Sequence, residues 1–385
     1  LTRFNEVLRF DLNKWNSEYK YYPYIVNMYD FSILSFVKEI MGSKPFYDYE
    51  NIHKQQNKNY IATNYRLGKS DERWQNITDS ISVSKLKISP NGSFLIGVGN
   101  DKKAKLRLAV ANVRLNYQNF KNVVEGTPNR SYKRYRELSS VVNQALDYHA
   151  DMLVMPEAYI PFEWLPIVAR TCAKNDMAII TGVEHIKYGD KIFNFTAIIL
   201  PYTYNTDSKC ALISFHLKRH YAPREKENIN GYRLQEVEGS HYELYKWKDC
   251  YFPVYCCYEL TSISDRSLFQ SYADLVIAVE WNKDVNYYSN ILESLSRDIH
   301  CYCVQVNTSD YGDSRITKPA KTEEKDIIRT KGGINSTVLI DDVDINKLRE
   351  FQFKNYILQK GDKFKPTPPG FDPNIVLKKI RGEKL

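Results

Sequence analysis

The stretch SYKRYRELSSVVNQALDYHADMLVMPE, residues 131–157, is a helical pattern followed directly by a short apolar strand. Between Ser131 and Ala150, apolar residues recur every three or four positions, a spacing that places them on one face of a helix. Met152–Met155 is a continuous apolar run, as in a strand that is buried on both faces. A helix that leads into such a strand is a building unit of layered α/β folds.

The same alternation continues on both sides of this stretch. Further helices are predicted at 161–175, 265–272 and 288–300. Further strands are predicted at 106–113, 177–184, 192–200, 211–217, 252–257, 275–280, 302–307 and 336–340. Strands that alternate with helices predict an α/β layered sandwich.

Two flanks differ from this central pattern. Residues 1–104 are rich in Tyr and Asn and are interpreted as an extension, with a helix over 31–41 and a hairpin over 81–98. Residues 105–350 are expected to form the main domain. Residues 351–385 are basic and proline-containing, and we expect an extended arm that wraps a partner or the body. The chain begins with Leu1, so we expect a piece of a longer polypeptide or a processed chain.

Composition and charge exclude several classes of protein. The chain has 385 residues and a formal net charge of +8, which lies in the two flanks and leaves residues 105–350 near neutral. No stretch approaches the roughly 18 consecutive apolar residues of a membrane span. A nucleic-acid-binding module driven by the basic flanks is one alternative, but no motif of the common nucleic-acid-binding folds is present. A neutral body fits a small-molecule pocket better, and direct nucleic-acid binding by the core is not expected.

The cysteines indicate a reducing compartment. There are seven, an odd number, and they lie in apolar runs with no signal peptide at the start of the chain. We therefore expect free thiols and a cytoplasmic location. No pair has the C-x-x-C spacing of a zinc site, and no glycine-rich phosphate loop is present, so neither a metal nor a cofactor is predicted.

Three residues are candidates for a catalytic site, each with a structural alternative. Cys257 stands near the end of a predicted buried strand, where it is a nucleophile or a small core residue. Glu157 follows Met-Pro at the end of another strand, as a general base or a surface charge. Lys218 follows a third apolar run, as an oxyanion-stabilising cation or a member of a solvated basic cluster with Arg219 and His220.

The order of these patches resembles the nitrilase superfamily of carbon–nitrogen hydrolases over about residues 105–345. Glu157 follows Met-Pro, Lys218 opens a K-x-H-x-x-P run, and Cys257 opens C-Y-E. Downstream, residues 312–319 resemble the family's G-x-S-x-I-x-x-P motif. Residues 297–301 stand where the family carries R-A-x-E-N, and they lack the E-N element.

This resemblance implies an α-β-β-α four-layer sandwich and a specific chemistry. Cys257 would attack an amide, carbamoyl or nitrile carbon and form a thioester, with Glu157 as general base and Lys218 holding the oxyanion. Cys256 would point to the other side of the strand and pack in the core. No cofactor is implied, and at least a homodimer is expected. The supporting and pocket residues that we assign are Tyr258, Glu259, Glu280, Trp281 and a second glutamate, for which Glu225 and Glu227 compete.

A narrower resemblance concerns the segments 301–319, 331–333 and 342–346. They look like divergent nitrilase-like domains fused to the C-terminus of reverse transcriptases in bacterial anti-phage defence systems. The resemblance implies a role in defence and a fused or associated reverse transcriptase. Under an alternative hypothesis, the domain serves that larger protein as an oligomerisation or regulatory module with little or no hydrolysis.

Overall fold

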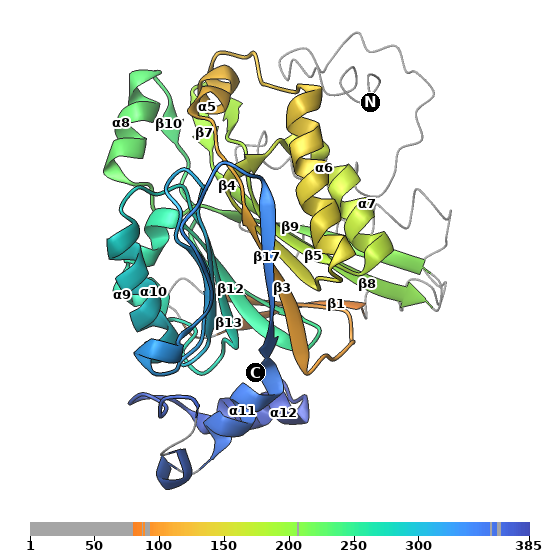
Figure 1. The fold of residues 1–385 in the computed structure, drawn as a ribbon, viewed down its shortest axis with the longest axis vertical. Helices are drawn as coiled ribbons and strands as arrows, with labels where there is room; N and C mark the ends of the chain where they lie inside the picture. The colour runs from red at the N-terminus through yellow and green to blue at the C-terminus, as the bar shows by residue number, and fades with distance from the viewer. Residues whose placement is uncertain (1–79, 87, 89–92, 206–207, 355, 360–362) are drawn as a thin grey trace.

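Two β-sheets face each other and carry helices on their outer surfaces (Figure 1). The computed structural model describes residues 80–86, 88, 93–205, 208–354, 356–359 and 363–385. The helix predicted over 31–41 lies outside these residues. The mixed α/β fold with layered sheets is the architecture that the sequence predicts.

The first sheet has eight strands in the order β1-β2-β11-β12-β13-β14-β15-β16. Its central strands β12, β13 and β14 are parallel to one another. The strand bounds are Ile81–Leu86 (β1), Ser93–Val98 (β2), Glu243–Trp247 (β11), Cys250–Cys256 (β12), Leu275–Val279 (β13), Tyr302–Val306 (β14), Ser314–Thr317 (β15) and Asp326–Thr330 (β16).

The second sheet has six strands in the order β17-β3-β4-β5-β8-β9. Strands β3, β4 and β5 are parallel, and two antiparallel pairings through β8 make β9 parallel to them again. The bounds are Lys105–Asn112 (β3), Met152–Ile160 (β4), Ala178–Val183 (β5), Phe195–Asn205 (β8), Ser208–Leu217 (β9) and Thr337–Asp344 (β17). A small sheet is formed by Ile186–Tyr188 (β6), Lys191–Phe193 (β7) and Gln235–Glu236 (β10).

Alternating residues on each strand separate the apolar cores. On β4, Met152 and Val154 face the core between the sheets, whereas Leu153 and Met155 pack on the outer side. That outer core is covered by α6 (Tyr132–Asp147) and α7 (Leu165–Asn175). The outer face of the first sheet packs on α10 (Val285–Ile299). These cores define the four layers of an α-β-β-α sandwich.

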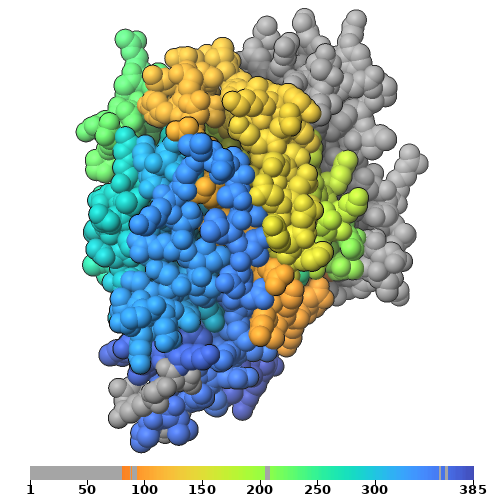
Figure 2. Space-filling model, viewed as in Figure 1, coloured from red at the N-terminus to blue at the C-terminus, as the bar shows by residue number. Residues whose placement is uncertain are grey.

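Two short helices, α5 (Tyr117–Val124) and α8 (Pro223–Gly231), lie at the upper end of the molecule (Figure 1). A third, α9 (Ile263–Ser267), lies lower. The 3₁₀ turns are Phe162–Trp164 (η1), Cys257–Thr261 (η2), Thr322–Glu324 (η3) and Tyr356–Gln359 (η4). Figure 2 shows α5 and α8 side by side at the top. No helix in the described ranges has both the length and the apolar character that a membrane crossing requires.

Both flanks contribute to the sandwich more than the sequence indicated. The hairpin predicted over 81–98 is present as β1 and β2, but β2 also pairs in parallel with β11 and so belongs to the eight-stranded sheet. At the other end, α11 (Ile345–Phe353) crosses the expected boundary at residue 350. With α12 (Pro373–Arg381) it forms a helical layer at the lower end of the molecule (Figure 1). This segment is therefore packed against the body, with two helices where we expected an extended arm.

A buried charge cluster anchors these C-terminal helices. Asp274 accepts bonds from Lys379 Nζ at 2.8 Å and from Arg349 Nε at 3.0 Å. All three side chains are buried. Burial raises the pKa of Asp274, but the two cations outweigh this and lower it to about 2. Breaking such a cluster leaves charges buried without compensation, which costs far more than forming it gains.

We therefore predict that Asp274→Asn destabilises the protein by roughly 3–5 kcal/mol, measured as the free energy of unfolding in denaturant. Asp342→Asn is the matched control, because Asp342 also pairs with an arginine, Arg107, but both side chains are nearly half exposed. The control should cost less than about 1 kcal/mol. Equal losses in the two variants would contradict the anchoring role of Asp274.

Candidate active site

A cavity of about 770 Å³ opens where strands of both sheets end. It is lined by Glu157 from β4, Lys218 directly after β9, and Cys257 directly after β12. Because β4 and β9 point the same way, their carboxyl-terminal parts meet at one edge of the six-stranded sheet. Loops at this edge of α/β sheets are where ligand sites collect. The three candidate residues thus line a single cavity.

Glu157 reaches the cavity through an irregularity in β4. The pairing with β5 passes from Met155–Thr181 to Ile160–Val183, so four residues of β4 lie opposite one residue of β5. That one residue is Gly182, where an added Cβ would lie 2.3 Å from the Cα of Glu157. Only glycine allows this close approach of the two backbones. The bulge turns the Glu157 side chain out of the regular strand alternation.

Lys218 is held between two carboxylates. Its Nζ donates to Glu157 Oε1 at 2.8 Å and to Glu225 Oε2 at 2.7 Å. Asn194 Nδ2 donates to the same two carboxylates, to Glu157 Oε1 at 2.8 Å and to Glu225 Oε1 at 3.1 Å. Of the two competing glutamates, Glu225 contacts Lys218 and lines the cavity, whereas Glu227 is exposed on α8 and does not line it.

The charges of this cluster are fixed by their mutual contacts. Burial lowers the pKa of Lys218, but Glu157 and Glu225 overcome it and hold that pKa well above its usual value. Burial raises the pKa of Glu225, but Lys218 and His185 bring it down to about 2. An ammonium group has three N–H donors. Two of them are used by the two glutamates.

Cys257 sits on a sharp strand-to-helix turn. β12 ends at Cys256, η2 begins at Cys257, and Cys257 has a left-handed φ of 49°. A non-glycine residue in this conformation costs on the order of 1–3 kcal/mol, and such strain is typical of functional sites. Cys256 belongs to the core between the sheets, as predicted, whereas Cys257 lines the cavity.

Buried Glu259 holds this turn from behind. Its carboxylate accepts the backbone N–H of Cys256 and that of Arg219, both at 2.6 Å. It also contacts His216 Nε2 at 3.0 Å, and His216 Nδ1 lies 2.9 Å from Glu243. Burial lowers the pKa of His216, but Glu259 and Glu243 raise it to about 10. Glu259 therefore links the cysteine turn to the residue after Lys218 and does not line the cavity.

The Cys257 thiol is protonated in the resting site. Burial raises its pKa well above the usual value, Glu157 adds to that effect, and Lys218 opposes it. The thiolate is the reactive form of cysteine. A nucleophilic Cys257 therefore needs a base that takes its proton as the new bond forms, and Glu157 is the carboxylate of the same cavity that acts on its pKa.

Glu280 is a buried carboxyl behind the cavity. It does not line the cavity, and its Oε2 accepts a bond from Gln305 Nε2 at 2.8 Å. Burial raises its pKa to about 8, with a further contribution from Glu157. Glu280 is therefore mainly protonated at neutral pH, and it adds little negative charge behind the cavity.

This raised pKa makes stability depend on pH. Between pH 4.5 and about 8 the folded protein keeps the Glu280 proton that the unfolded chain has lost, so stability falls as the pH rises through this window. We predict that Glu280→Gln removes this loss and is more stable than the wild type by on the order of 3 kcal/mol at pH 8, but not at pH 4. Unfolding in denaturant at both pH values checks this, and parallel curves for the two proteins would contradict it.

The remaining predicted residues divide between the cavity wall and its surroundings. Tyr258 and Trp281 line the cavity with Glu157, Lys218, Cys257 and Glu225, whereas Glu227, Glu259 and Glu280 do not. Sequence reasoning missed Asn194, His185 and Tyr288. Asn194 did carry a signal, since it is a lone amide between Phe193 and Phe195 in an apolar run.

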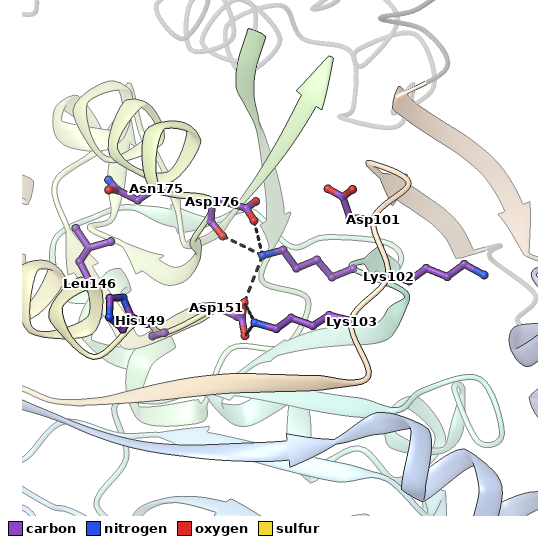
Figure 3. A pocket seen from close by; sticks show the side chains of 10 residues that line it. Asp101, Lys102, Lys103, Leu146, His149, Asp151, Asn175 and Asp176 are labelled. Carbon is purple, nitrogen blue, oxygen red and sulfur yellow. Dashed lines mark hydrogen bonds and ion pairs between the residues drawn. The ribbon is translucent and has the colours of Figure 1, made fainter. Parts of the chain in front are cut away.

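A second cavity, of about 410 Å³, lies at the opposite ends of the strands (Figure 3). Lys103 and Lys248 are both within 3.3 Å of Asp151, and Lys248 also pairs with Asp176. These charges neutralise one another, and no cysteine lines this cavity. Within the described ranges, no group of three metal-ligating side chains has the arrangement of a metal site.

The comparisons with known proteins concern the fold. No protein-family model and no curated protein matches the chain. One similar solved structure is a CN-hydrolase superfamily protein of Xanthomonas campestris with an arsenic adduct in its active site. It is 14% identical in sequence with a TM-score of 0.46, and the match covers 68% of this chain and 99% of that one. An amidase from Nesterenkonia sp. is 12% identical with a TM-score of 0.47, over 66% and 95%. A nitrilase-superfamily member of branch 10 from Saccharomyces cerevisiae is 16% identical with a TM-score of 0.46, over 66% and 96%.

Proposed function

We propose that this chain is a carbon–nitrogen hydrolase that cleaves an amide, carbamoyl or nitrile group through a thioester on Cys257. One observation carries the proposal: a cysteine on a strained turn shares a cavity with a lysine held between the buried carboxylate of Glu157 and the partly buried carboxylate of Glu225. A nucleophile, a base and a fixed oxyanion-stabilising group together can carry out acyl transfer from an amide.

The acylation half follows from this arrangement. The Glu157 carboxylate takes the thiol proton while Sγ bonds to the carbonyl carbon, and the C=O π electrons move onto oxygen. The third N–H of Lys218 donates to this oxyanion. When the oxyanion re-forms its double bond, the C–N bond breaks, and Glu157 returns the proton to the departing nitrogen. Ammonia or an amine leaves, and the acyl group stays on sulfur.

Deacylation repeats the same proton transfers with water. Glu157 takes a proton from water as its oxygen adds to the thioester carbon, and Lys218 again holds the oxyanion. The C–S bond then breaks, the thiolate leaves and regains the proton, and a carboxylic acid is released. Glu225 accepts a hydrogen bond from Lys218, and Asn194 donates to both Glu157 and Glu225. These contacts keep Glu157 and Lys218 in place throughout.

The test is release of ammonia from a panel of acetamide, phenylacetamide, N-carbamoylglycine and phenylacetonitrile. We expect at least one amide or carbamoyl compound to give ammonia and its acid product with repeated turnover. No release from any probe, at protein concentrations in the micromolar range, would count against hydrolysis.

We also propose, from the sequence resemblance alone, that the domain works in the cytoplasm within a reverse-transcriptase defence protein and forms a homodimer or larger oligomer. The alternative is the oligomerisation or regulatory module with little or no hydrolysis; the lost E-N element at 297–301 is a departure from the family pattern, but none of these residues lines the cavity. Phage protection and oligomer size are to be compared between wild type and Cys257→Ala. Lost protection with an unchanged oligomer supports hydrolysis, and unchanged protection supports the module.

A further inference from the structure

Seven aromatic side chains line the cavity that holds the catalytic groups. They are Tyr117, Phe120, Tyr258, Trp281, Tyr287, Tyr288 and Tyr311. Tyr117 stacks on Phe120 with centroids 5.6 Å apart and lies 6.0 Å from Trp281. Tyr117 and Tyr287 are 41% and 48% exposed, so the aromatic wall reaches the surface. Such a wall suits a flat ring, which gains from stacked or edge-on contacts.

Three cations surround this aromatic rim. Lys121 lies over the Tyr117 ring at 5.6 Å, and Lys283 lies over the Tyr311 ring at 5.5 Å. Arg224, at the start of α8, lines the cavity with Lys283. Within the described ranges, none of the three has a carboxylate at ion-pair distance. Asp284 lies next to Lys283 and caps α10 by accepting the Tyr287 backbone N–H at 3.4 Å.

The charge at the cavity floor differs from the charge at the rim. At the floor, Lys218 lies between Glu157 and Glu225, and Glu280 behind them is mainly protonated at neutral pH. The floor therefore has a slight negative charge, whereas the rim has a positive surplus, because Lys121, Arg224 and Lys283 outnumber Asp284, which also lines the cavity. Because two ring faces already carry the protein's own lysines, the rim does not offer an open aromatic cage to a cationic ligand.

We infer that the substrate is an amide whose distant end is a flat ring bearing an anionic group. The ring packs on the Tyr117–Trp281 wall, and the anion meets Arg224 and Lys283, while the amide reaches Cys257. This inference rests on the proposed hydrolysis and adds the substrate class to it. Arg224 and Lys283 are its specificity-determining residues.

The test uses three phenylacetamides whose para substituents are anionic, neutral and cationic: 4-(carbamoylmethyl)benzoate, 4-methylphenylacetamide and 4-(aminomethyl)phenylacetamide. The value of kcat/KM for ammonia release is measured for each at pH 7. We expect the anionic probe to exceed the neutral one by about fivefold per engaged cation, and the cationic probe to be the poorest. The same measurement with a phosphonate in place of the carboxylate shows which of these two anionic groups gives the higher kcat/KM.

Arg224→Gln and Lys283→Gln should each lower the ratio of kcat/KM for the anionic probe to kcat/KM for the neutral probe about fivefold. The matched control is Lys226→Gln on the same helix, because Lys226 pairs with Glu236 and Glu238 and does not line the cavity. High salt should reduce the preference for the anion, since it screens exposed charges.

Binding of the same probes to Cys257→Ala, by calorimetry, separates this inference from the proposed function. Hydrolysis of all three probes at equal rates would overturn the inference and leave hydrolysis standing. Charge-selective binding that is lost in Arg224→Gln, without hydrolysis by the wild type, would support the inference and count against hydrolysis. If no probe were bound and no probe were hydrolysed, the inference would be overturned.

Discussion

Cys257→Ala is expected to abolish hydrolysis, with a fall in kcat of at least about 10⁴-fold, because it removes the atom that carries the acyl group. The fold should survive, since the alanine keeps Cβ and the turn is held by the Glu259 bonds to the backbone of Cys256 and Arg219. Ammonia release under saturating substrate, together with the circular dichroism spectrum, measures both effects.

The neighbouring cysteine provides the matched control for this prediction. Cys256 is buried in the core between the sheets and does not line the cavity. Cys256→Ala should cost about 1 kcal/mol of stability, as a small core truncation does, and keep kcat within a few fold. If Cys256→Ala were inactive and Cys257→Ala active, the assignment of the nucleophile would be wrong.

Glu157→Gln is expected to lower kcat by about 10²–10⁴-fold with little change in KM. The glutamine has the same shape, and its oxygen can still accept from Lys218, but it cannot take the thiol proton. Because burial and Glu157 keep that thiol protonated, the loss falls on the chemical step rather than on binding. Steady-state kinetics of ammonia release separate kcat from KM.

Glu227→Gln is the matched control for Glu157→Gln. Glu227 is the exposed glutamate on α8 that competed with Glu225 in the sequence, and its replacement should leave both constants unchanged. If Glu157→Gln kept full kcat while Glu225→Gln lost it, the base would be Glu225.

Most strands and helices of the central sandwich were readable from the sequence because each carries a strong apolar pattern, but β11, β15 and β16 of the eight-stranded sheet were not predicted. The run 152–155 became β4, and the pattern 131–150 became α6. The helices α5 and α8 were missed because each buries only one or two residues. The packing of α12 was hidden for a different reason: its buried Lys379 is indistinguishable in sequence from an exposed lysine until Asp274 is placed beside it.

The site was partly predictable for similar reasons. Glu157, Lys218 and Cys257 follow three apolar runs, and their meeting in one cavity depends on strand direction, which alternation of elements indicates. The choice of Glu225 over Glu227 depends on the helical turn that begins at Pro223 and points one side chain inward. The mainly protonated state of Glu280 depends on burial, which a residue's identity alone does not reveal.

The central claim is an acyl group carried on Cys257, and mass spectrometry of an acid-quenched reaction tests it directly. With an amide that the chain hydrolyses, the account predicts a protein species heavier by the acyl group, mapped to the peptide that contains Cys257 and absent in Cys257→Ala. Glu157→Gln is the control that should form little of it. Continuing ammonia release with no adduct, or an adduct on Cys256, would contradict the account.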